Sequence, residues 1–491
     1  MTDNIIAFHK WQKKDVQKLY NSINKFLELE SLQFYMPFFS LYYYIHNTPN
    51  ATKRIDLKKK YELREIHEII KKRYYNSNMI LKASIYDYGK NIIENKEVFC
   101  KMIPIIDCIH CVNNNYNFIS NSNHYLPSAY NYNTFSKINN IDNMAYIDVL
   151  CYYLFGQLTL TNILPSFPLF YGSVNGIGNY NYEITEDYDE LKRDKCFRNN
   201  INKGFDLNVY CSDSESDSDS DSENDSESDS PNKTQVHSES DSTESDDSMQ
   251  DEYIAILKKI PVQLLFIDRL KGTLEDIIDN EFNDDILLSC LFQITFALTY
   301  LQRHFNFSHN DLHINNIMYD ECKTEYLYYK INNKYFKVPT YGKIFKIIDF
   351  GRSILTYNNK VFMNDVYSKN GEAYGQYNYP EQVNFVKSKN TDNYINQSCP
   401  YFDLCRLSMT ILDEVEESDF KNSELYNLLV TMSTDTNGDS FLDKPDNFDI
   451  YIDICKYARN TLPANIILHN IFNTYRISKK KFPRKSFYSL S

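Results

Sequence analysis

The stretch SHNDLHINNIM, residues 308–318, carries a single carboxylate, Asp311, five positions before the amide of Asn316. A second stretch, FKIIDFG at residues 345–351, ends in another carboxylate, Asp349, followed by a phenylalanine and a glycine. The apolar residues before Asp349 predict a strand, and the glycine predicts a tight turn after it. The chain is therefore expected to bring one loop and one strand end together, with these three polar side chains as the candidate site.

These three side chains suit phosphoryl transfer, a reaction that depends mainly on positioning and charge neutralisation. One aspartate can hold the acceptor hydroxyl while an asparagine and a second aspartate hold Mg²⁺ against the phosphates of ATP. Asp311 is then the catalytic candidate, and Asn316 and Asp349 are the candidate metal ligands. Here the sequence resembles the protein kinases, whose HRDLxxxN loop and DFG turn correspond to HNDLHINN and DFG. Either motif alone also occurs by chance, so the resemblance depends on their order and context.

The resemblance implies an α+β, two-lobed protein-kinase-like fold, with a small, mainly β lobe and a large, mainly α lobe. We expect an N-terminal helical extension at residues 1–75 and a small lobe with insertions at 76–272. A large lobe at 273–475 and a basic tail at 476–491 should follow. The order of HNDLHINN, a long inserted hairpin, KIIDFGR and FDLCRL is most similar to the serine/threonine-protein kinases of large DNA viruses of the giant-virus type.

Helices and a hairpin are predicted near the N-terminus. Residues 11–29 and 57–72 carry apolar residues at mixed spacings of three and four, which predicts helices. β-Branched and aromatic residues at 79–87 and 98–103 flank a turn signal that begins at Gly89, which predicts a β-hairpin. The glycine-rich loop GxGxxG of the kinases is absent, and Gly89 stands alone in the hairpin turn.

Two candidate nucleotide-binding residues follow from the resemblance. Lys101 stands where the kinase pattern VAIK has the lysine that grips the α- and β-phosphates; the alternative is a solvated strand lysine. The helix predicted over residues 143–163 offers Asp148 near its start to orient that lysine. Aspartate is one methylene shorter than the usual glutamate, and the alternative is a first-turn residue favoured by the helix dipole.

An acidic insertion of Ser-Asp and Ser-Glu repeats interrupts the small lobe at residues 211–252. Its 16 acidic residues and one lysine leave 50 acidic against 51 basic residues in the remainder, so the net charge of −14 implies no nucleic-acid partner. With almost no apolar residue, the insertion is expected to be disordered. Strands are predicted on either side of it, at 164–172 and 262–267, with a hinge between the lobes at 268–272.

The large lobe is predicted to be mostly helical. Regularly spaced apolar residues at 287–301 predict an amphipathic helix with Asn283 or Asp284 as its N-cap. Aromatic runs at 326–331 and 334–338 predict an added hairpin. A polar segment at 352–379 stands in the place of an activation loop. Three further helices are expected at 401–407, 424–432 and 450–472.

The resemblance also implies structural roles for His309 and Asp403. Asp403 stands where kinases have a buried aspartate that hydrogen-bonds the catalytic loop; the alternative is a capping aspartate. Two other residues depart from the family pattern. Asn310 replaces the loop arginine, so control by a phosphorylated activation loop is less expected, and His313 replaces a lysine, as in small-molecule kinases of the HGDLHxxN kind.

The expected function is a serine/threonine-protein kinase that uses ATP and Mg²⁺ on an unidentified protein substrate. A pseudokinase that acts as an interaction module and a small-molecule kinase are the alternatives. The intact trio of polar residues favours catalysis, whereas the missing glycine loop and the short Asp148 favour the pseudokinase. The long polar segment after the DFG turn suits a peptide substrate better than a small molecule.

The cellular location is expected to be intracellular. The eleven cysteines form no disulfide framework, and the CIHC stretch at residues 108–111 has no partner pair to complete a zinc site. The first 15 residues have no signal-peptide pattern, and no segment approaches eighteen uninterrupted apolar residues, so no membrane is expected. The viral resemblance would imply the host cytoplasm or the virion. The oligomeric state is not predicted.

Overall fold

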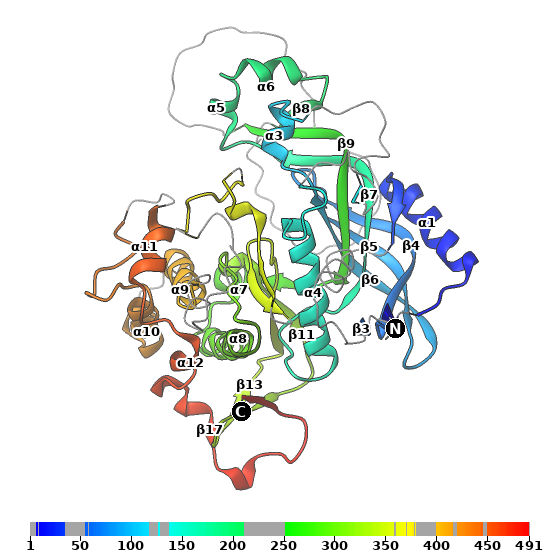
Figure 1. Ribbon diagram of the computed structural model, residues 1–491. Helices are drawn as coiled ribbons and strands as arrows, with labels where there is room; N and C mark the ends of the chain where they lie inside the picture. Colours follow the sequence, from blue (N-terminus) through cyan, green and yellow to red (C-terminus); the bar gives the residue numbers. More distant parts are fainter. Residues whose placement is uncertain are drawn as a thin grey trace.

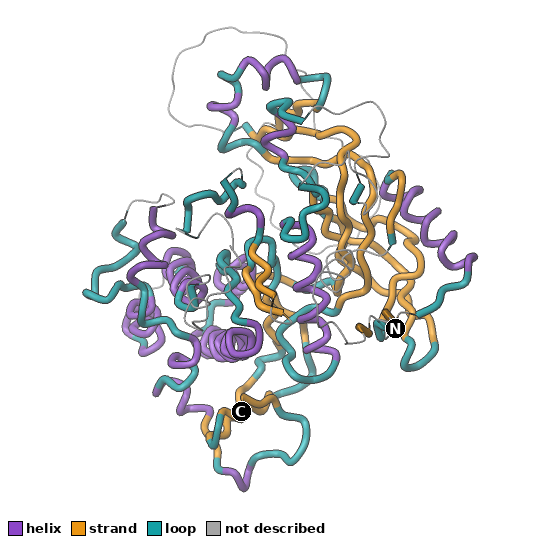
Figure 2. Tube along the Cα trace, viewed as in Figure 1, coloured by secondary structure: helices purple, strands orange, loops and turns teal. Residues whose placement is uncertain are grey.

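The computed structural model describes residues 6–7, 9–34, 55–56, 58–116, 126–127, 137–210, 251–357, 360–369, 371–377, 379, 399–415, 420–444 and 449–490. Within them the chain has an α+β structure with mostly antiparallel sheets, which confirms the α+β part of the predicted fold class. Figure 2 shows the largest group of strands on the right of the view and most helices on the left. The acidic insertion lies, apart from its last two residues, outside the described residues.

The largest sheet has the strand order β2-β7-β9-β6-β5-β4, with β8 paired to β9 and all neighbours antiparallel. Along β5 the alternate residues Leu81, Ala83 and Ile85 are buried, with the period of two expected of a strand. The predicted hairpin is confirmed as β5 and β6, and the predicted strand at 262–267 lies within β9. The strand predicted at 164–172 begins only at β7. The bounds are β2 Glu30–Gln33, β4 Tyr61–Lys72, β5 Met79–Asp87, β6 Ile92–Pro104, β7 Phe170–Glu183, β8 Phe205–Tyr210 and β9 Glu252–Asp268.

The helix predicted over residues 57–72 is wrong, because most of this segment is strand β4. Leu63, Ile66 and Ile69 face the core at a spacing of three, and the pairing with β5 has an irregularity after each of them. A bulge adds one residue to a strand, so a repeatedly bulged strand imitates the spacing of a helix. Since β4 belongs to the largest sheet, residues 1–75 are not a helical extension throughout.

The helix predicted over residues 11–29 is confirmed as α1, Lys13–Leu27, which packs against β4 (Figure 1). Its buried face includes Leu19 and Ile23. Ser22 Oγ, on the same face, accepts the backbone N–H of Ile66 at 3.1 Å. The helix therefore both covers apolar residues of the bulged strand and satisfies one of its backbone donors.

Helix α4, Met144–Leu160, stands between the largest sheet and the helix-rich part (Figure 1) and confirms the helix predicted over 143–163. Every residue from Ala145 to Gly156 is buried, as expected of a helix that is apolar on all sides. The Asn143 side chain caps it by accepting the Ala145 N–H at 3.0 Å. Near β8 and the far end of the paired strands β7 and β9, at the top of Figure 1, lie the short helices α3 Cys108–Val112, α5 Tyr188–Leu191 and α6 Lys195–Asn200.

The helix-rich part is built around α8, whose predicted N-cap is confirmed: Asn283 Oδ1 accepts the Asp285 and Ile286 N–H groups at 2.9 and 3.2 Å. Among the described residues, α8 alone is long and apolar enough to cross a membrane, but 72% of its apolar window is buried inside the structure. The helix predicted over 450–472 is wrong in its middle, because the chain leaves α11 and restarts with Pro463 in the first turn of α12. The bounds are α7 Leu274–Glu281, α8 Asp284–Phe305, α9 Phe402–Glu414, α10 Glu424–Met432, α11 Asp449–Tyr457 and α12 Pro463–Ile466.

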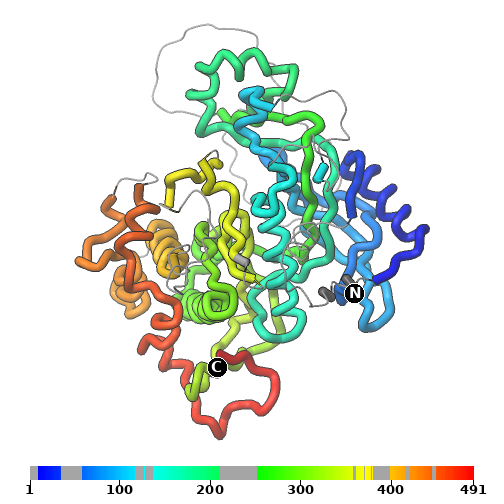
Figure 3. Tube along the Cα trace, in the orientation of Figure 1, coloured from blue at the N-terminus to red at the C-terminus, as the bar shows by residue number. Residues whose placement is uncertain are grey.

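Small sheets complete the fold. The predicted hairpin at 326–338 is confirmed as β12 and β13, which lie in a four-stranded sheet with order β17-β13-β12-β18. The two ends of the basic tail predicted at 476–491 pair with this hairpin as β17 and β18, and Leu490 is only 1% exposed. Figure 3 shows the red C-terminal segment beside the hairpin. The bounds are β1 Ile6–Ala7, β3 Ile55–Asp56, β10 Gly272–Thr273, β11 Ile317–Glu321, β12 Tyr326–Ile331, β13 Lys334–Pro339, β14 Lys343–Ile347, β15 Ile354–Tyr357, β16 Lys360–Met363, β17 Arg476–Ile477 and β18 Tyr488–Leu490.

Candidate functional site

A buried carboxylate, that of Asp403, holds the backbone of the loop that carries Asp311. Asp403, in the first turn of α9, accepts the backbone N–H groups of His309 and Asn310, each at 2.9 Å, and is 0% exposed. Burial raises the pKa of Asp403, and the donated hydrogen bonds oppose that shift. The two bonds fix the loop backbone immediately before Asp311.

His309 joins the loop to the residue that precedes Asp349. Its Nε2 lies 2.8 Å from the carbonyl oxygen of Ile348, and because a carbonyl can only accept, Nε2 is the protonated nitrogen. The ring also lies 5.6 Å from the ring of Phe350. Both residues predicted to have structural roles, His309 and Asp403, therefore contact the segments that carry the candidate site.

Asn316 and Asp349 emerge side by side from two paired strands. β11 begins where β14 ends because the two strands are antiparallel, and the Ile348 N–H donates to the Asn316 carbonyl at 3.1 Å. The side-chain amide of Asn316 donates to the Asp311 carbonyl at 2.8 Å. One hydrogen bond therefore joins Asn316 to Ile348, the residue before Asp349, and a second bond within the loop joins Asn316 to Asp311.

Lys101 on β6 bridges two of the predicted carboxylates. Its Nζ donates to Asp148 Oδ2 at 2.7 Å and to Asp349 Oδ1 at 2.9 Å. The other oxygen of Asp148, Oδ1, accepts the Phe350 N–H at 2.8 Å. Burial raises the pKa of Asp148, and the Lys101 ammonium and the Phe350 N–H oppose that shift. Despite its short side chain, Asp148 reaches the lysine directly, and it also holds the turn after Asp349.

The charges of this cluster shift the pKa values of its members. Burial raises the pKa of Asp349, but attraction by the Lys101 ammonium outweighs this effect and lowers the pKa to about 2. Burial lowers the pKa of Lys101, but Asp148 and Asp349 together hold it well above its usual value. Lys101 is therefore a cation and Asp349 a carboxylate at neutral pH.

Aromatic packing fixes the turn that follows Asp349. The ring of Phe350 is fully buried and lies 4.9 Å from Tyr152 and 5.2 Å from Phe155, both on α4. Tyr152 also accepts the Asp349 N–H through its hydroxyl at 2.9 Å. α4 therefore contacts the turn through Asp148, Tyr152 and Phe155. Tyr152 was not predicted as a site residue, because a tyrosine on an apolar helix has no signal beyond its burial.

Asn310, noted only as a departure from the family pattern, has a defined structural position. It adopts a left-handed conformation (φ 64°), its Nδ2 donates to the Arg352 carbonyl at 3.0 Å, and its Oδ1 accepts from the Tyr379 hydroxyl at 2.9 Å. The Tyr377 hydroxyl donates to the Asn310 carbonyl at 2.6 Å. Asn310 thus connects the loop to three residues of the segment after the DFG turn.

A cavity of about 330 Å³ opens onto the cluster and is lined by Lys101, Asp148, Asp311 and Asp349. The turn between β4 and β5 also lines it, through Asn76 and Asn78. Asn78 Oδ1 accepts the Met102 N–H at 3.1 Å, next to Lys101. The turn at Gly89, where the glycine of the predicted hairpin stands, joins β5 to β6 at the opposite end of these strands. The turn at 73–78 lacks a glycine, and its signal was the cluster Asn76-Ser77-Asn78, which favours a turn but does not indicate contact with a nucleotide.

The side chains present fit Mg²⁺ and a nucleotide. Asn316 uses its NH₂ group within the loop, which leaves its amide oxygen as the group suited to a cation. Asp349 is ionised and its side chain is 43% exposed, so it is accessible to a solute. Mg²⁺ is usually bound by one or two such oxygen ligands together with phosphates and water.

Part of the chain is similar to the serine/threonine-protein kinase haspin. The sequence is 29% identical to the protein of Bos taurus over 113 residues and 24% identical to that of Mus musculus over 155 residues. These matches cover 23% and 32% of this chain but only 14% and 20% of the two relatives, so the chain spans at most a fifth of their length. No protein-family model matches the chain. The likeness to viral kinases stays a prediction. Over less than a third of its length, the chain thus resembles a serine/threonine-protein kinase.

Proposed function

We propose that this protein is a serine/threonine-protein kinase that transfers the γ-phosphate of ATP to a hydroxyl of a protein substrate, with Mg²⁺ as cofactor. The observation that carries the proposal is the cluster in which Lys101 bridges Asp148 and Asp349 at the cavity that Asp311 also lines. The partial similarity to haspin supports the same reaction class.

The arrangement of strands around the lysine supports a two-lobed kinase-like fold. β4, β5 and β6 form an antiparallel meander, and Lys101 is on its third strand. Protein kinases likewise have this lysine on their third strand, where an acidic residue of the following helix pairs with it. Here α4, which comes after β6 and the short helix α3, supplies Asp148. The larger helical part, from residue 273 onward, then corresponds to the large lobe.

In the proposed reaction each side chain has a separate task. Lys101 binds phosphate oxygens of ATP, and Asp148 keeps the lysine charged and oriented. Mg²⁺, when bound by Asn316 and Asp349, supplies charge neutralisation for the phosphates. Asp311 orients the acceptor hydroxyl and accepts its proton. His309 and Asp403 keep the loop in the conformation that presents Asp311.

The proposal is tested by the different roles that it gives to Asp311, in phosphate transfer, and to Asp349, in Mg²⁺ binding. ATP with Mg²⁺ at a hundredfold over its dissociation constant should stabilise the wild type by about 2.7 kcal/mol, measured as a rise in melting temperature. Asp349→Asn should remove the Mg²⁺-dependent part of that rise. Asp311→Asn should keep most of it but lower transfer to a mixed protein substrate by at least about 100-fold.

A control and two contrary outcomes complete the experiment. Asp453→Asn removes the charge of Asp453, a residue of α11 that pairs with Lys444, and should leave binding and transfer unchanged. A wild type that binds ATP but transfers nothing, and that behaves like Asp311→Asn, would make the protein a pseudokinase. Transfer to small hydroxyl compounds alone would instead identify a small-molecule kinase.

A further inference from the structure

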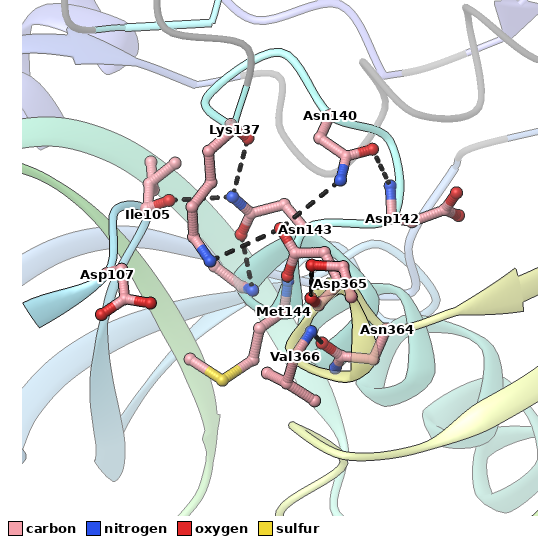
Figure 4. Close-up of polar contacts among 12 residues, drawn as sticks. Ile105, Asp107, Lys137, Asn140, Asp142, Asn143, Met144, Asn364, Asp365 and Val366 are labelled. Carbon is pink, nitrogen blue, oxygen red and sulfur yellow. Dashed lines mark hydrogen bonds and ion pairs between the residues drawn. The ribbon is translucent and has the colours of Figure 1, made fainter. Parts of the chain in front are cut away.

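The segment after the DFG turn meets the beginning of α4 at one buried carboxylate, Asp365. Asp365 Oδ1 accepts the backbone N–H of Met144, the first residue of α4, at 3.0 Å. Its Oδ2 lies 3.5 Å from Lys137 Nζ and 3.4 Å from Asn140 Nδ2. The Asp365 side chain is only 8% exposed. Figure 4 shows these donors converging on Asp365 from the chain that leads into α4.

The backbone around Asp365 makes the connection continuous. The Asp365 N–H donates to the Asp142 carbonyl at 2.8 Å, so main chain and side chain both contact the start of α4. The neighbouring Asn364 donates from its Nδ2 to the carbonyl of Gly351, the glycine of the DFG turn. Two adjacent residues therefore join the start of α4 on one side to the turn after Asp349 on the other; Figure 4 shows Asn364 and Asp365 beside Met144.

A carboxylate in this position stabilises the first turn of α4. The first N–H groups of a helix have no partner within it, and a negative charge near them is favoured by the helix dipole. Asn143 satisfies the Ala145 N–H, whereas the Met144 N–H is satisfied by Asp365. α4 is therefore capped both by its own N-cap residue and by a residue more than 200 positions later in the chain.

The first turn of α4 leads directly to Asp148, one turn after Met144. Asp148 is the residue that bonds both Lys101 and the Phe350 N–H. A tilt of α4 at its capped end would therefore move the carboxylate that orients the lysine. In regulated protein kinases the position of the corresponding helix is controlled by phosphorylation of the activation loop.

We propose that Asp365 is a positioning residue, which holds α4 and the Lys101–Asp148 pair in the arrangement that binds nucleotide. It does so as a fixed carboxylate, with no phosphate needed on the segment after the DFG turn. The replacement of the loop arginine by Asn310 agrees with this role, because a phosphate on that segment would lack its usual cationic partner in the loop. The inference rests on the proposed nucleotide site.

The test compares the affinity for Mg²⁺-ATP in two backgrounds by isothermal titration calorimetry. In the otherwise wild-type protein, Asp365→Ala should weaken the affinity about five- to tenfold, as expected for the loss of a helix cap. Asp365→Asn keeps an oxygen for the Met144 N–H and should have a smaller effect, which also covers the case that Asp365→Ala fails to fold. In a Lys101→Met background, Asp365→Asn or Asp365→Ala should change the affinity less than twofold, because the lysine it positions is gone.

The matched control is Asp206→Asn, which removes a carboxylate from the exposed Lys258–Asp206 pair on β8 and β9, and should leave affinity unchanged. An unchanged affinity in the Asp365 variants, or an equal loss in both backgrounds, would overturn the inference. Hydrogen exchange without nucleotide separates this failure from failure of the proposed function. If Asp365 holds α4, the Met144 amide should exchange at least about tenfold faster in Asp365→Ala, and by a smaller factor in Asp365→Asn, whether or not the protein binds ATP, and an unchanged rate in both variants would contradict the role.

Discussion

At the scale of single residues, Asp403 makes the clearest stability prediction. Its carboxylate is the acceptor for the buried N–H groups of His309 and Asn310. Asp403→Ala leaves both donors without it, and each buried donor without a partner costs about 1–3 kcal/mol. The free energy of unfolding, measured by urea titration, should therefore fall by about 2–6 kcal/mol.

The control for this prediction is Asp453→Ala, which removes one partner of the Lys444–Asp453 pair, whose side chains are 29% and 33% exposed. Partly exposed pairs of this kind contribute about 0–1 kcal/mol, so the loss should be small. Equal losses for Asp403→Ala and Asp453→Ala would mean that Asp403 does not hold the loop.

Several contacts of the candidate site follow from sequence, and several do not. Lys101, Asp148, Asp349 and the loop that carries Asp311 were predicted from motif order, and they meet at one cavity. Asn310, Tyr152, Asn78 and Asp365 were not predicted to contact the site. Each acts through a backbone group of a distant segment, and a bond between a side chain and a remote main-chain atom has no signature in residue spacing. Asp403 was the exception. Its bond to the loop backbone was predicted because the FDLCRL motif follows the DFG turn in the order that the kinases have.

At the scale of elements, β4 shows why periodicity alone misassigned one segment. Bulges after Leu63, Ile66 and Ile69 shift the inward side of the strand by one residue each time. The apolar residues therefore recur at three, which is a helical spacing. Bulges are set by how a strand pairs and curves, and sequence-local patterns do not contain that information. The regular strand β5, which alternates buried and less buried residues for most of its length, was predicted correctly.

The contact between the N-terminal segment and β4 predicts a pH-dependent signal from the only tryptophan of the chain. Glu62 Oε2 accepts from Trp11 Nε1 and from the Tyr88 hydroxyl, both at 2.6 Å, and Lys59 lies 2.9 Å from Oε1. Burial raises the pKa of Glu62, but Lys59 and the hydrogen bond from Tyr88 outweigh it, so the pKa lies below 4.5. The stability that Glu62 contributes is therefore fully present above pH 4.5 and is lost as the pH falls through the lower folded-state pKa.

Tryptophan fluorescence checks this sign. In the wild type the Trp11 emission should shift as the pH falls below 4.5, because protonated Glu62 loses its attraction to Lys59 and its full acceptor capacity. Glu62→Gln should show the shifted emission already at pH 7 and no transition in that window. Glu65→Gln, which removes the Lys18–Glu65 contact between the same two elements, should retain the wild-type transition. A transition that survives in Glu62→Gln would assign the signal to another group.

At the scale of the whole molecule, the negative charge is concentrated in one segment of the chain. The acidic residues that produce the net charge of −14 are concentrated in residues 211–252, while the remainder of the chain is nearly balanced. The described residues on either side of this segment belong to two paired strands. β8 and β9 pair in a regular antiparallel register, from Phe205 with Leu257 to Tyr210 with Glu252. The insertion therefore leaves and rejoins the sheet at two directly opposed residues.

This geometry predicts that the insertion can be removed without disturbing the fold. Residues paired across antiparallel strands have Cα atoms about 4.5–5.5 Å apart, so an Asn-Gly turn can replace residues 211–251 and join Tyr210 to Glu252 as a tight hairpin. Because the segment has almost no apolar residue to bury, its removal should leave the melting temperature and the affinity for Mg²⁺-ATP unchanged within error. A second variant that keeps the length but replaces each acidic residue of 212–247 by its amide separates charge from chain length. A lower melting temperature in the deletion alone would mean that the segment packs on the fold, and a change in both variants would mean that its charge acts on the rest of the molecule.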